Sequence, residues 1–175
     1  MHKILWHNTR DWHHKCEEHP VGAAMSAGNP PREWYASWLA TLHTLHSSMD
    51  TIMPTCAHRA AELQQDMDEM EMDEIFIPEP AIQWKQTFSQ ELVDTDTILG
   101  FAYVLTGAHL MGGEIMRRRL EGFPVNHLTW NDRKETLAYL ETLRHREELT
   151  AGAIKCFKAL YRSMEEIQNN FPQNS

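Results

Sequence analysis

The chain has 175 residues, enough for one domain with a buried core, and its 23% charged and 42% hydrophobic residues are typical of a folded protein. A net charge of -9, from 16 Lys and Arg against 25 Asp and Glu, argues against binding to nucleic acid or to an anionic membrane surface, because both favour clustered cations. Three cysteines without a C-x-x-C pair predict a reducing, cytoplasmic setting, and we expect neither a signal peptide nor a membrane span of ~20 apolar residues.

Helical periodicity dominates the first half of the chain. Residues 2–18 predict a first helix that stops at His19-Pro20, and the glycines and prolines that follow predict a loop up to Pro31. Pro31 opens a second helix, which Pro54 ends. A third helix is expected over 55–72, with the acidic run DMDEMEMDE as a solvated face whose methionines turn to the core. The stretch IPEP at 77–80 predicts a rigid connector.

The second half of the chain is also predicted to be helical. A short helix is expected over 81–92 and a long one over 94–121, followed by the loop FPVNHLTW. Asn131 is expected to cap a helix that reaches about residue 148, and Thr150 to cap the last one. That helix carries an apolar stripe of Ile154, Phe157, Leu160, Met164 and Ile167. The predicted fold class is therefore all-α, a single-domain bundle of six to eight helices spanning residues 1–175.

The stretch TRDWHHKCEEH at 9–19 concentrates histidines and glutamates on the first predicted helix. His13 and Glu17 are four residues apart and so share one face of the helix, with Thr9 one turn before them. A histidine that ligates a metal normally needs its second ring nitrogen held by an acceptor, which a carboxylate one turn away provides. His14 is rotated off this face. The alternative is a polar helix whose imidazoles are solvated or complement its carboxyl end.

The stretch TGAHLMGGE at 106–114 places three glycines within a predicted helix, where each costs roughly 1 kcal/mol relative to alanine. Such a sequence is typical of a backbone that bends or approaches another group closely. We expect a thin, kinked helix wall, with the ring of His109 above it, against which a flat ligand can lie. The wall residues are Gly107, Ala108, Met111, Gly112 and Gly113. The alternative is helix–helix packing through small residues.

Together the two stretches resemble the haem oxygenase family. The first helix of that family carries Thr-[Lys/Arg]-[Asp/Glu]-x-His, which here reads Thr9-Arg10-Asp11-Trp12-His13. Its distal helix carries Tyr-x(8)-Gly-Gly, which here is Tyr103 followed by Gly112-Gly113. Residues 39–50 and 57–67 and the final apolar stripe are similar to its second, third and last helices, so the resemblance covers most of residues 8–168.

The resemblance implies a haem oxygenase-like helical fold that binds haem b as both prosthetic group and substrate. With O2 and electrons from ferredoxin or a flavin reductase, such a protein produces biliverdin, carbon monoxide and ferrous iron. The resemblance makes His13 the axial iron ligand and Glu17 the residue that orients it, while Gly112 and Gly113 bring backbone close to the distal face. The other haem-contacting residues that it implies are Thr9, Tyr103, Gly107, Met111, Lys134 and Phe157.

Three positions depart from the family pattern. His109 stands where many members have a distal carboxylate, His46 where they often have a phenol, and Ala138 where an arginine is common. Two imidazoles can donate and accept through water, so His46 and His109 can keep a proton relay and act as catalytic residues. A second nitrogen on the iron would instead give a bis-histidine haem without an open position, and hence a haem carrier or sensor that does not degrade haem.

A third hypothesis is a non-haem di-iron oxidase of the same fold, using Glu17, Glu62 and Glu114. It is disfavoured because the chain contains no Glu-x-x-His pair. The triplet Arg117-Arg118-Arg119 either complements a helix carboxyl end or forms a docking patch for an acidic electron donor. His43, His58 and His127 have no companion ligands at metal spacing and are interpreted as surface or satisfied core histidines.

Overall fold

The computed structural model describes residues 3–90 and 93–173, and within these ranges all regular structure is helical. Eight α-helices are present when the continuous run from α6 to α7 is counted once, which confirms the predicted all-α fold. The helices are α1 (Ile4–Glu18), α2 (Pro20–Ala27), α3 (Arg32–Met49), α4 (Ala60–Glu69), α5 (Glu79–Ser89), α6 (Thr95–Gly107), α7 (Gly113–Arg119), α8 (Arg133–Leu143) and α9 (Thr150–Asn170). A π-helical turn, Ala108–Gly112, joins α6 to α7. Short 3-10 turns occupy Thr55–Ala57, Asn126–Leu128 and Glu147–Leu149.

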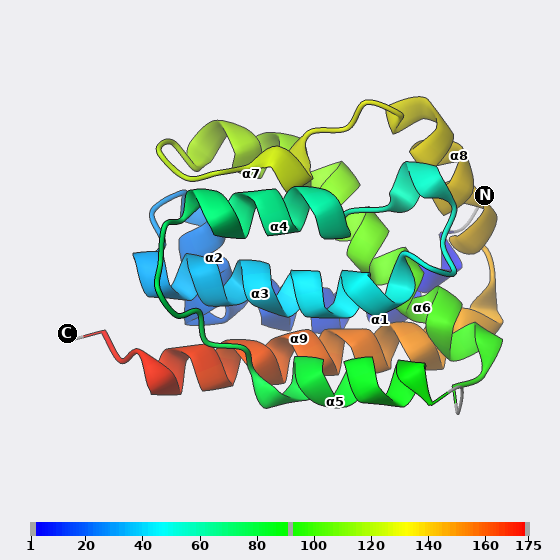
Figure 1. The fold of residues 1–175 in the computed structure, drawn as a ribbon. Coiled ribbons are helices and arrows are strands. Elements are labelled where there is room, and N and C mark those ends of the chain that lie inside the picture. The colour runs from blue at the N-terminus through cyan, green and yellow to red at the C-terminus, as the bar shows by residue number, and fades with distance from the viewer. Residues whose placement is uncertain (1–2, 91–92, 174–175) are drawn as a thin grey trace.

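The helices form a layered bundle around α9. Figure 1 shows α5, α9, α3 and α4 stacked side by side, with α7 and α8 beyond α4 and with α1 behind α3. Helix α9 packs on α1, α3, α5 and α6, because its predicted apolar stripe faces inward. Of that stripe, Phe157, Leu160, Met164 and Ile167 are buried. This arrangement holds α1 and α6, the helices that carry the two candidate stretches, against one common support.

Two glycines set the distance between α6 and α9. A Cβ added to Gly100 would lie 2.4 Å from the backbone nitrogen of Ala153, and one added to Gly152 would lie 2.6 Å from the Cα of Thr97. Both distances are too short for a real contact, so larger side chains would force the helices apart. The helical run Thr95–Arg119, from α6 to α7, is called the distal run below. At these glycines its backbone packs directly against that of α9.

The predicted loop between residues 19 and 31 is largely a helix. Pro20 occupies the first position of α2, where its missing N–H costs nothing, and the His19 ring accepts a hydrogen bond from the Val21 N–H. Gly22 lies inside this helix, where only glycine fits, because a Cβ would lie 2.0 Å from the Cys16 carbonyl oxygen. Gly28 ends the helix in the left-handed conformation, with φ of 83°. The prediction was wrong because the glycines serve packing and helix ending here, not a loop.

Several predicted helix boundaries also differ. Helix α3 ends at Met49, before Pro54, and the predicted helix over 55–72 begins only at Ala60, where Asp50 accepts hydrogen bonds from the backbone N–H groups of Arg59 and Ala60. Asn131 and Thr150 are not caps, because α8 begins at Arg133 and Thr150 is itself the first residue of α9. The predicted limits at residues 2 and 92 lie outside the described residues.

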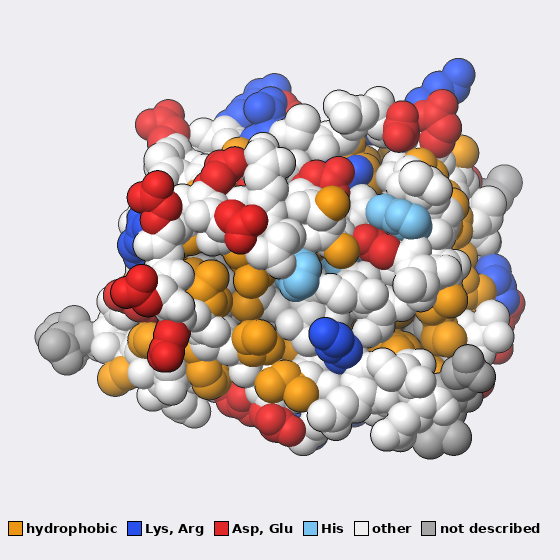
Figure 2. Space-filling view, in the orientation of Figure 1, with side chains coloured by type: hydrophobic (Ala, Val, Ile, Leu, Met, Phe, Trp, Pro, Cys, Tyr) orange, Lys and Arg blue, Asp and Glu red, His pale blue; other side chains and the backbone are white. Residues whose placement is uncertain are grey.

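Figure 2 shows acidic side chains over the end of α4 and the segment that follows it. As predicted for this run, Asp68 and Glu69 are exposed and Met70 is fully buried. Asp66 is the exception, because it is completely buried. The run therefore contains one acidic residue whose role is internal.

The helical run Thr95–Arg119 is long and apolar enough to cross a membrane by length and composition, contrary to the sequence-based expectation. Half of its most apolar window is buried inside the protein. Because core helices pass the same test, the packing on α9 accounts for this apolarity.

Candidate functional site

His13 lies on a half-covered face of α1. Its Nδ1 lies 3.3 Å from a carboxylate oxygen of Glu17, the geometry expected for residues four apart on a helix. Its ring meets that of Phe157 edge-on at 5.9 Å and that of Trp6 at 5.0 Å. The side chain of His13 is 29% exposed, and that of Glu17 is 56% exposed. The contact is not a hydrogen bond, because Nδ1 of His13 is buried without a hydrogen-bond partner among the described residues. A carboxylate beside Nδ1 leaves Nε2 as the nitrogen available to a ligand.

Thr9 and Phe157 build the support beneath this histidine. The Thr9 hydroxyl is buried and donates to the Leu5 carbonyl at 2.6 Å, so it stabilises α1 from within. Phe157 is buried on α9, and its ring lies edge-on beside that of His13. The sequence placed His14 away from this face, but its ring lies 6.2 Å from that of His13.

One nitrogen or oxygen from each of His13, His14 and Glu17 lies within 4.8 Å of the others. This is the group of metal-capable side chains found among residues 3–90 and 93–173. Glu62 and Glu114 are not part of this group. Glu62 lies 3.5 Å from Arg59, and Glu114 pairs with arginines of its own helix, so these contacts disfavour the di-iron hypothesis.

The second stretch forms the π-helical turn, the bend that its glycines predicted. A π turn inserts one extra residue into a helix and is frequent at functional sites. Arg133 of α8 donates from its guanidinium to the Leu110 carbonyl oxygen at 2.9 Å. The π turn is therefore tied to α8 by a side-chain hydrogen bond.

The two adjacent glycines of this turn have different surroundings. A Cβ added to Gly112 would find no atom within 4 Å, whereas one added to Gly113 would lie 3.2 Å from a methyl group of Leu128. Gly113 is buried, and Gly112 is not. Gly112 thus leaves open space beside the helix, and Gly113 permits packing against the Asn126–Leu128 turn. The packing interpretation therefore applies to Gly113, and the functional interpretation stays a prediction for Gly112.

The remaining predicted haem contacts are spread over α6, the π turn and α8. Tyr103 and Gly107 are half-buried on α6, and Lys134 is exposed on α8. Met111 is 53% exposed, and Ile115, one turn further on, is 58% exposed. Burial raises the pKa of the Tyr103 hydroxyl, so it remains protonated and able to donate a hydrogen bond.

Three histidines from different segments meet beside the π turn. The His109 ring stacks on that of His46 from α3, with centroids 5.6 Å apart and planes 25° apart. The His109 ring also meets that of His127, with centroids 5.5 Å apart and planes 84° apart. All three are buried, at 6%, 0% and 1% exposure in the order given. These three residues are called the histidine cluster below.

Two carboxylates fix the outer rings of the histidine cluster. Asp50 approaches Nδ1 of His46 at 3.0 Å and also accepts two backbone N–H groups at the start of α4. Asp66 approaches Nδ1 of His127 at 2.5 Å and accepts the backbone N–H groups of residues 126 and 127, as well as the Asn126 side-chain amide. Both carboxylates are thereby held by backbone, which makes them rigid partners for the imidazoles.

Burial and neighbouring charge keep the centre of the cluster neutral. Burial lowers the pKa of His109 well below its ordinary value, and the nearby His127 and His46 lower it further. Burial also lowers the pKa of His127, against the opposing effect of Asp66. Burial raises the pKa of Asp66, but the hydrogen bonds from His127 and its backbone outweigh burial, so the carboxyl remains ionised.

Nδ1 of His109 and Nε2 of His46 are buried without a hydrogen-bond partner among the described residues. Such atoms normally find a partner, which in proteins is often water. Arg59 lies beside the cluster, with its guanidinium 3.6 Å from the Trp130 ring centre and donating to the Thr129 carbonyl. The cluster is therefore a polar interior in contact with the π turn.

The Arg117–Arg119 triplet is largely engaged in local interactions. Arg117 and Arg118 both pair with Glu114, at 3.2 and 3.0 Å, and Arg119 donates to the Ser26 carbonyl of α2. These contacts favour the structural interpretation of the triplet, because a docking patch requires free positive charge.

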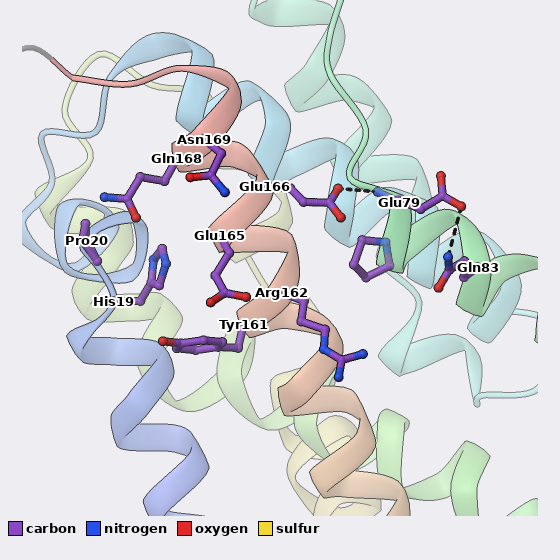
Figure 3. A pocket seen from close by; sticks show the side chains of 11 residues that line it. His19, Pro20, Glu79, Gln83, Tyr161, Arg162, Glu165, Glu166, Gln168 and Asn169 are labelled. Carbon is purple, nitrogen blue, oxygen red and sulfur yellow. Dashed lines mark hydrogen bonds between the residues drawn. The ribbon is translucent and has the colours of Figure 1, made fainter.

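Figure 3 shows a groove between the carboxyl half of α9, the start of α5 and the corner between α1 and α2. None of the predicted site residues lines it. Its polar groups hold the corner together, since Glu166 accepts the Glu79 N–H at the start of α5 and the His19 ring packs on Tyr161 at 5.2 Å. The groove is therefore distinct from the faces that carry His13 and His109.

Sequence reasoning missed four residues that complete the site. Asp50 was detectable, because it follows His46 by four residues on one helix. His127 was interpreted as a surface or satisfied core histidine, and its bond to Asp66 supports the second of these. Asp66 was assigned to a solvated face, and Arg133 was not considered. Their partners lie 61 and 23 residues away, so no local pattern relates them.

A comparison with known protein families found no match, and neither did a search of curated protein sequences. Solved structures do match. Haem oxygenase from Leptospira interrogans is similar at a TM-score of 0.77 and 15% identity, over 93% of this chain and 97% of that one. Haem oxygenase-1 from the cyanobacterium Synechocystis, solved with haem, is similar at 0.72 and 17%, over 95% and 90%.

Haem oxygenase-2 from Synechocystis, solved with haem and NO, is similar at a TM-score of 0.79 and 17% identity, over 96% of this chain and 85% of that one. The three structures share one fold and cover nearly all of this chain. The chain therefore has the haem oxygenase fold.

Proposed function

We propose that this protein is a haem oxygenase, which binds haem b between α1 and the distal run and converts it to biliverdin, carbon monoxide and ferrous iron. O2 and electrons from ferredoxin or a flavin reductase are the co-reactants. One observation carries the proposal. A carboxylate-oriented histidine on α1 and a glycine-thinned π turn bearing a neutral histidine occur together in a haem oxygenase fold.

The residues present fit haem. The site offers a partly exposed imidazole whose second nitrogen is oriented by Glu17. It also offers apolar side chains exposed on both candidate walls, at 41% for Trp6 of α1, 53% for Met111 and 58% for Ile115. Apolar side chains available on both walls suit a flat apolar ligand. The open space at Gly112 adds room on the distal side.

On the proximal side, His13 would hold the iron through Nε2. The Glu17 carboxylate lies 3.3 Å from Nδ1 without a hydrogen bond in this structure. With haem bound, it would accept from Nδ1, which fixes the tautomer and raises the basicity of the ligating nitrogen. Phe157 and Trp6 keep the ring upright by packing edge-on against it. When bound, haem supplies the iron that activates O2 and the macrocycle that is cleaved.

On the distal side, His109 would act as a hydrogen-bonding group and not as a second iron ligand. A neutral imidazole can accept a proton at one nitrogen and release one from the other. Because Nδ1 is buried, Nε2 is the nitrogen left to face a ligand above Gly112. His46 would accept a proton next, further inside the protein than His109. Its hydrogen bond to Asp50 holds it away from the distal face.

The test is direct. Haemin is added to the purified protein, the absorption spectrum is recorded, and ferredoxin with its reductase or a flavin reductase is supplied while biliverdin and carbon monoxide are followed. We expect a histidyl haem spectrum that decays as biliverdin accumulates. A low-spin bis-histidine spectrum that survives reductant and O2 would instead favour a haem carrier or sensor. Absence of haem binding would overturn both functions.

A further inference from the structure

The histidine cluster extends the proposed distal site beyond the residues that the sequence indicated. We propose that His127, held by Asp66, is a positioning residue that fixes the orientation of the His109 ring toward the distal face. This inference rests on the proposed function, because it names how the distal histidine of that function is held. It assigns a role to the loop between α7 and α8 and to one residue of α4.

The geometry gives His109 two walls. The His46 ring lies nearly parallel to it, at 25°, and the His127 ring meets it edge-on, at 84°. We expect an imidazole packed against two such rings to turn about its Cβ–Cγ bond only when one of them moves. The His46 wall belongs to the long helix α3. The His127 wall belongs to a three-residue 3-10 turn, which helix packing alone does not hold rigid.

Asp66 supplies the missing rigidity. Its two oxygens accept from the backbone of both Asn126 and His127 as well as from the His127 ring. A buried carboxylate that gathers backbone and imidazole donors of one turn fixes both the turn and the ring within it. Asp66 therefore ties the position of the His127 ring to helix α4.

The surroundings of His109 explain why the orientation of its ring matters more than its charge. The charged and titratable groups facing it are His46, with Asp50 behind it, His127, with Asp66 behind it, and Arg59. Arg59 and the two imidazoles all favour a neutral His109. A neutral imidazole acts through the direction of its N–H and its lone pair, which depends on how its ring is fixed.

The first experiment needs no haem. Long-range proton–nitrogen NMR spectra of the histidine rings are compared between the wild type and His127→Asn, Asp66→Asn and Asp68→Asn. In His127→Asn the amide replaces the Nδ1 donor to Asp66 but removes the ring wall. We expect His109 to change from one neutral tautomer to a mixture in His127→Asn and Asp66→Asn. The exposed Asp68→Asn, on the same helix, should leave His109 unchanged.

Unchanged His109 ring signals in a folded His127→Asn would overturn the proposal. If Asp66→Asn does not fold, His127→Asn still decides, since it keeps Asp66 satisfied. The haem-loaded proteins give the second readout. We expect haem affinity to stay within about twofold of wild type, while the turnover number falls on the order of tenfold, the scale seen when a partner that orients a functional histidine is lost.

A purely structural role for His127 would lower the melting temperature of the variant without changing its turnover number below that temperature, which would count against the proposal. If wild-type protein fails to bind haem, the proposed function fails. The NMR comparison then still tells whether His127 positions His109.

Discussion

The proximal and distal faces of the proposed haem site differ in how the chain builds them. The histidine–carboxylate pair of the proximal face comes from one helix, in which His13 and Glu17 lie four residues apart and both remain partly exposed. The histidine cluster on the distal side takes its three residues from α3, the π turn and the loop before α8, and all three are buried. The His13–Glu17 pair can form within α1 alone, whereas the histidine cluster forms only in the complete fold.

This difference separates function from stability. A partly exposed histidine–carboxylate pair contributes little to folding, so its residues can be changed with a mainly functional effect. The buried cluster joins several segments through charged hydrogen bonds, so changes there affect both the fold and the site. Variants at the two faces should therefore behave differently in parallel assays of haem binding and unfolding.

The largest expected effect is on haem binding when the proximal ligand is removed. His13→Ala deletes the only proposed bond to iron, so haem affinity should fall by more than the ~10–100-fold that loss of an orienting partner causes. The melting temperature of the haem-free protein should change little, because the side chain is partly exposed. Haemin titration followed by absorbance, with and without added imidazole, measures the effect.

His14→Ala is the matched control for this variant. The His14 ring lies close to His13 but is not packed on Phe157, so haem affinity should stay near that of wild type. Should His14→Ala weaken haem as much as His13→Ala, the assignment of the axial ligand would have to be revised.

The histidine cluster should make the stability of the haem-free protein sensitive to acid. His109 and His127 have pKa values lowered by burial, so the folded protein keeps them neutral where the unfolded chain binds protons, below about pH 6.5. Their stabilising effect is thus present above about pH 6.5 and is lost as the pH falls through the folded values. The free energy of unfolding should fall by up to ~1.4 kcal/mol per pH unit for each histidine.

Urea unfolding over a series of pH values measures this slope. In His109→Phe one of the two histidines no longer contributes, so the slope should become shallower by up to ~1.4 kcal/mol per pH unit. An equal slope in the variant and the wild type would show that His109 is not held neutral by the fold.

The same contrast explains what the sequence could predict. His13 with Glu17, the apolar stripe of α9 and the bend at the distal glycines are periodic or local features, and periodicity indicates them directly. Asp66 and His127 are 61 residues apart, and a run of acidic residues is typical of a solvated face, so nothing local marks Asp66 as buried. Gly22 was expected in a loop because its tight contact with Cys16 comes from the meeting of two helices.

A smaller effect is expected at the second distal glycine. Gly113→Leu places a large side chain against Leu128, whose methyl group already lies 3.2 Å from the position of a Cβ. The overpacking should cost about 1–3 kcal/mol of unfolding free energy and displace the turn that carries His127. Denaturant unfolding measures the cost. A variant as stable as the wild type would mean that the loop moves aside freely.

The smallest expected change is at Gly112, and it distinguishes space kept for a ligand from space left by chance. Gly112 has a helical φ of -87°, and an added Cβ meets no atom within 4 Å, so Gly112→Ala introduces neither strain nor overlap. Alanine reduces the freedom of the unfolded chain and should stabilise the haem-free protein by up to about 1 kcal/mol, or roughly 2–4 °C in melting temperature. The same methyl group occupies space above the proposed distal face, so biliverdin formation should slow several-fold while haem affinity changes little. A calorimetric melt of the haem-free variant and a turnover assay of the loaded one together give the answer. Higher stability with undiminished turnover would show that the space beside Gly112 is unused, and the distal ligand would then have to approach from another part of the π turn.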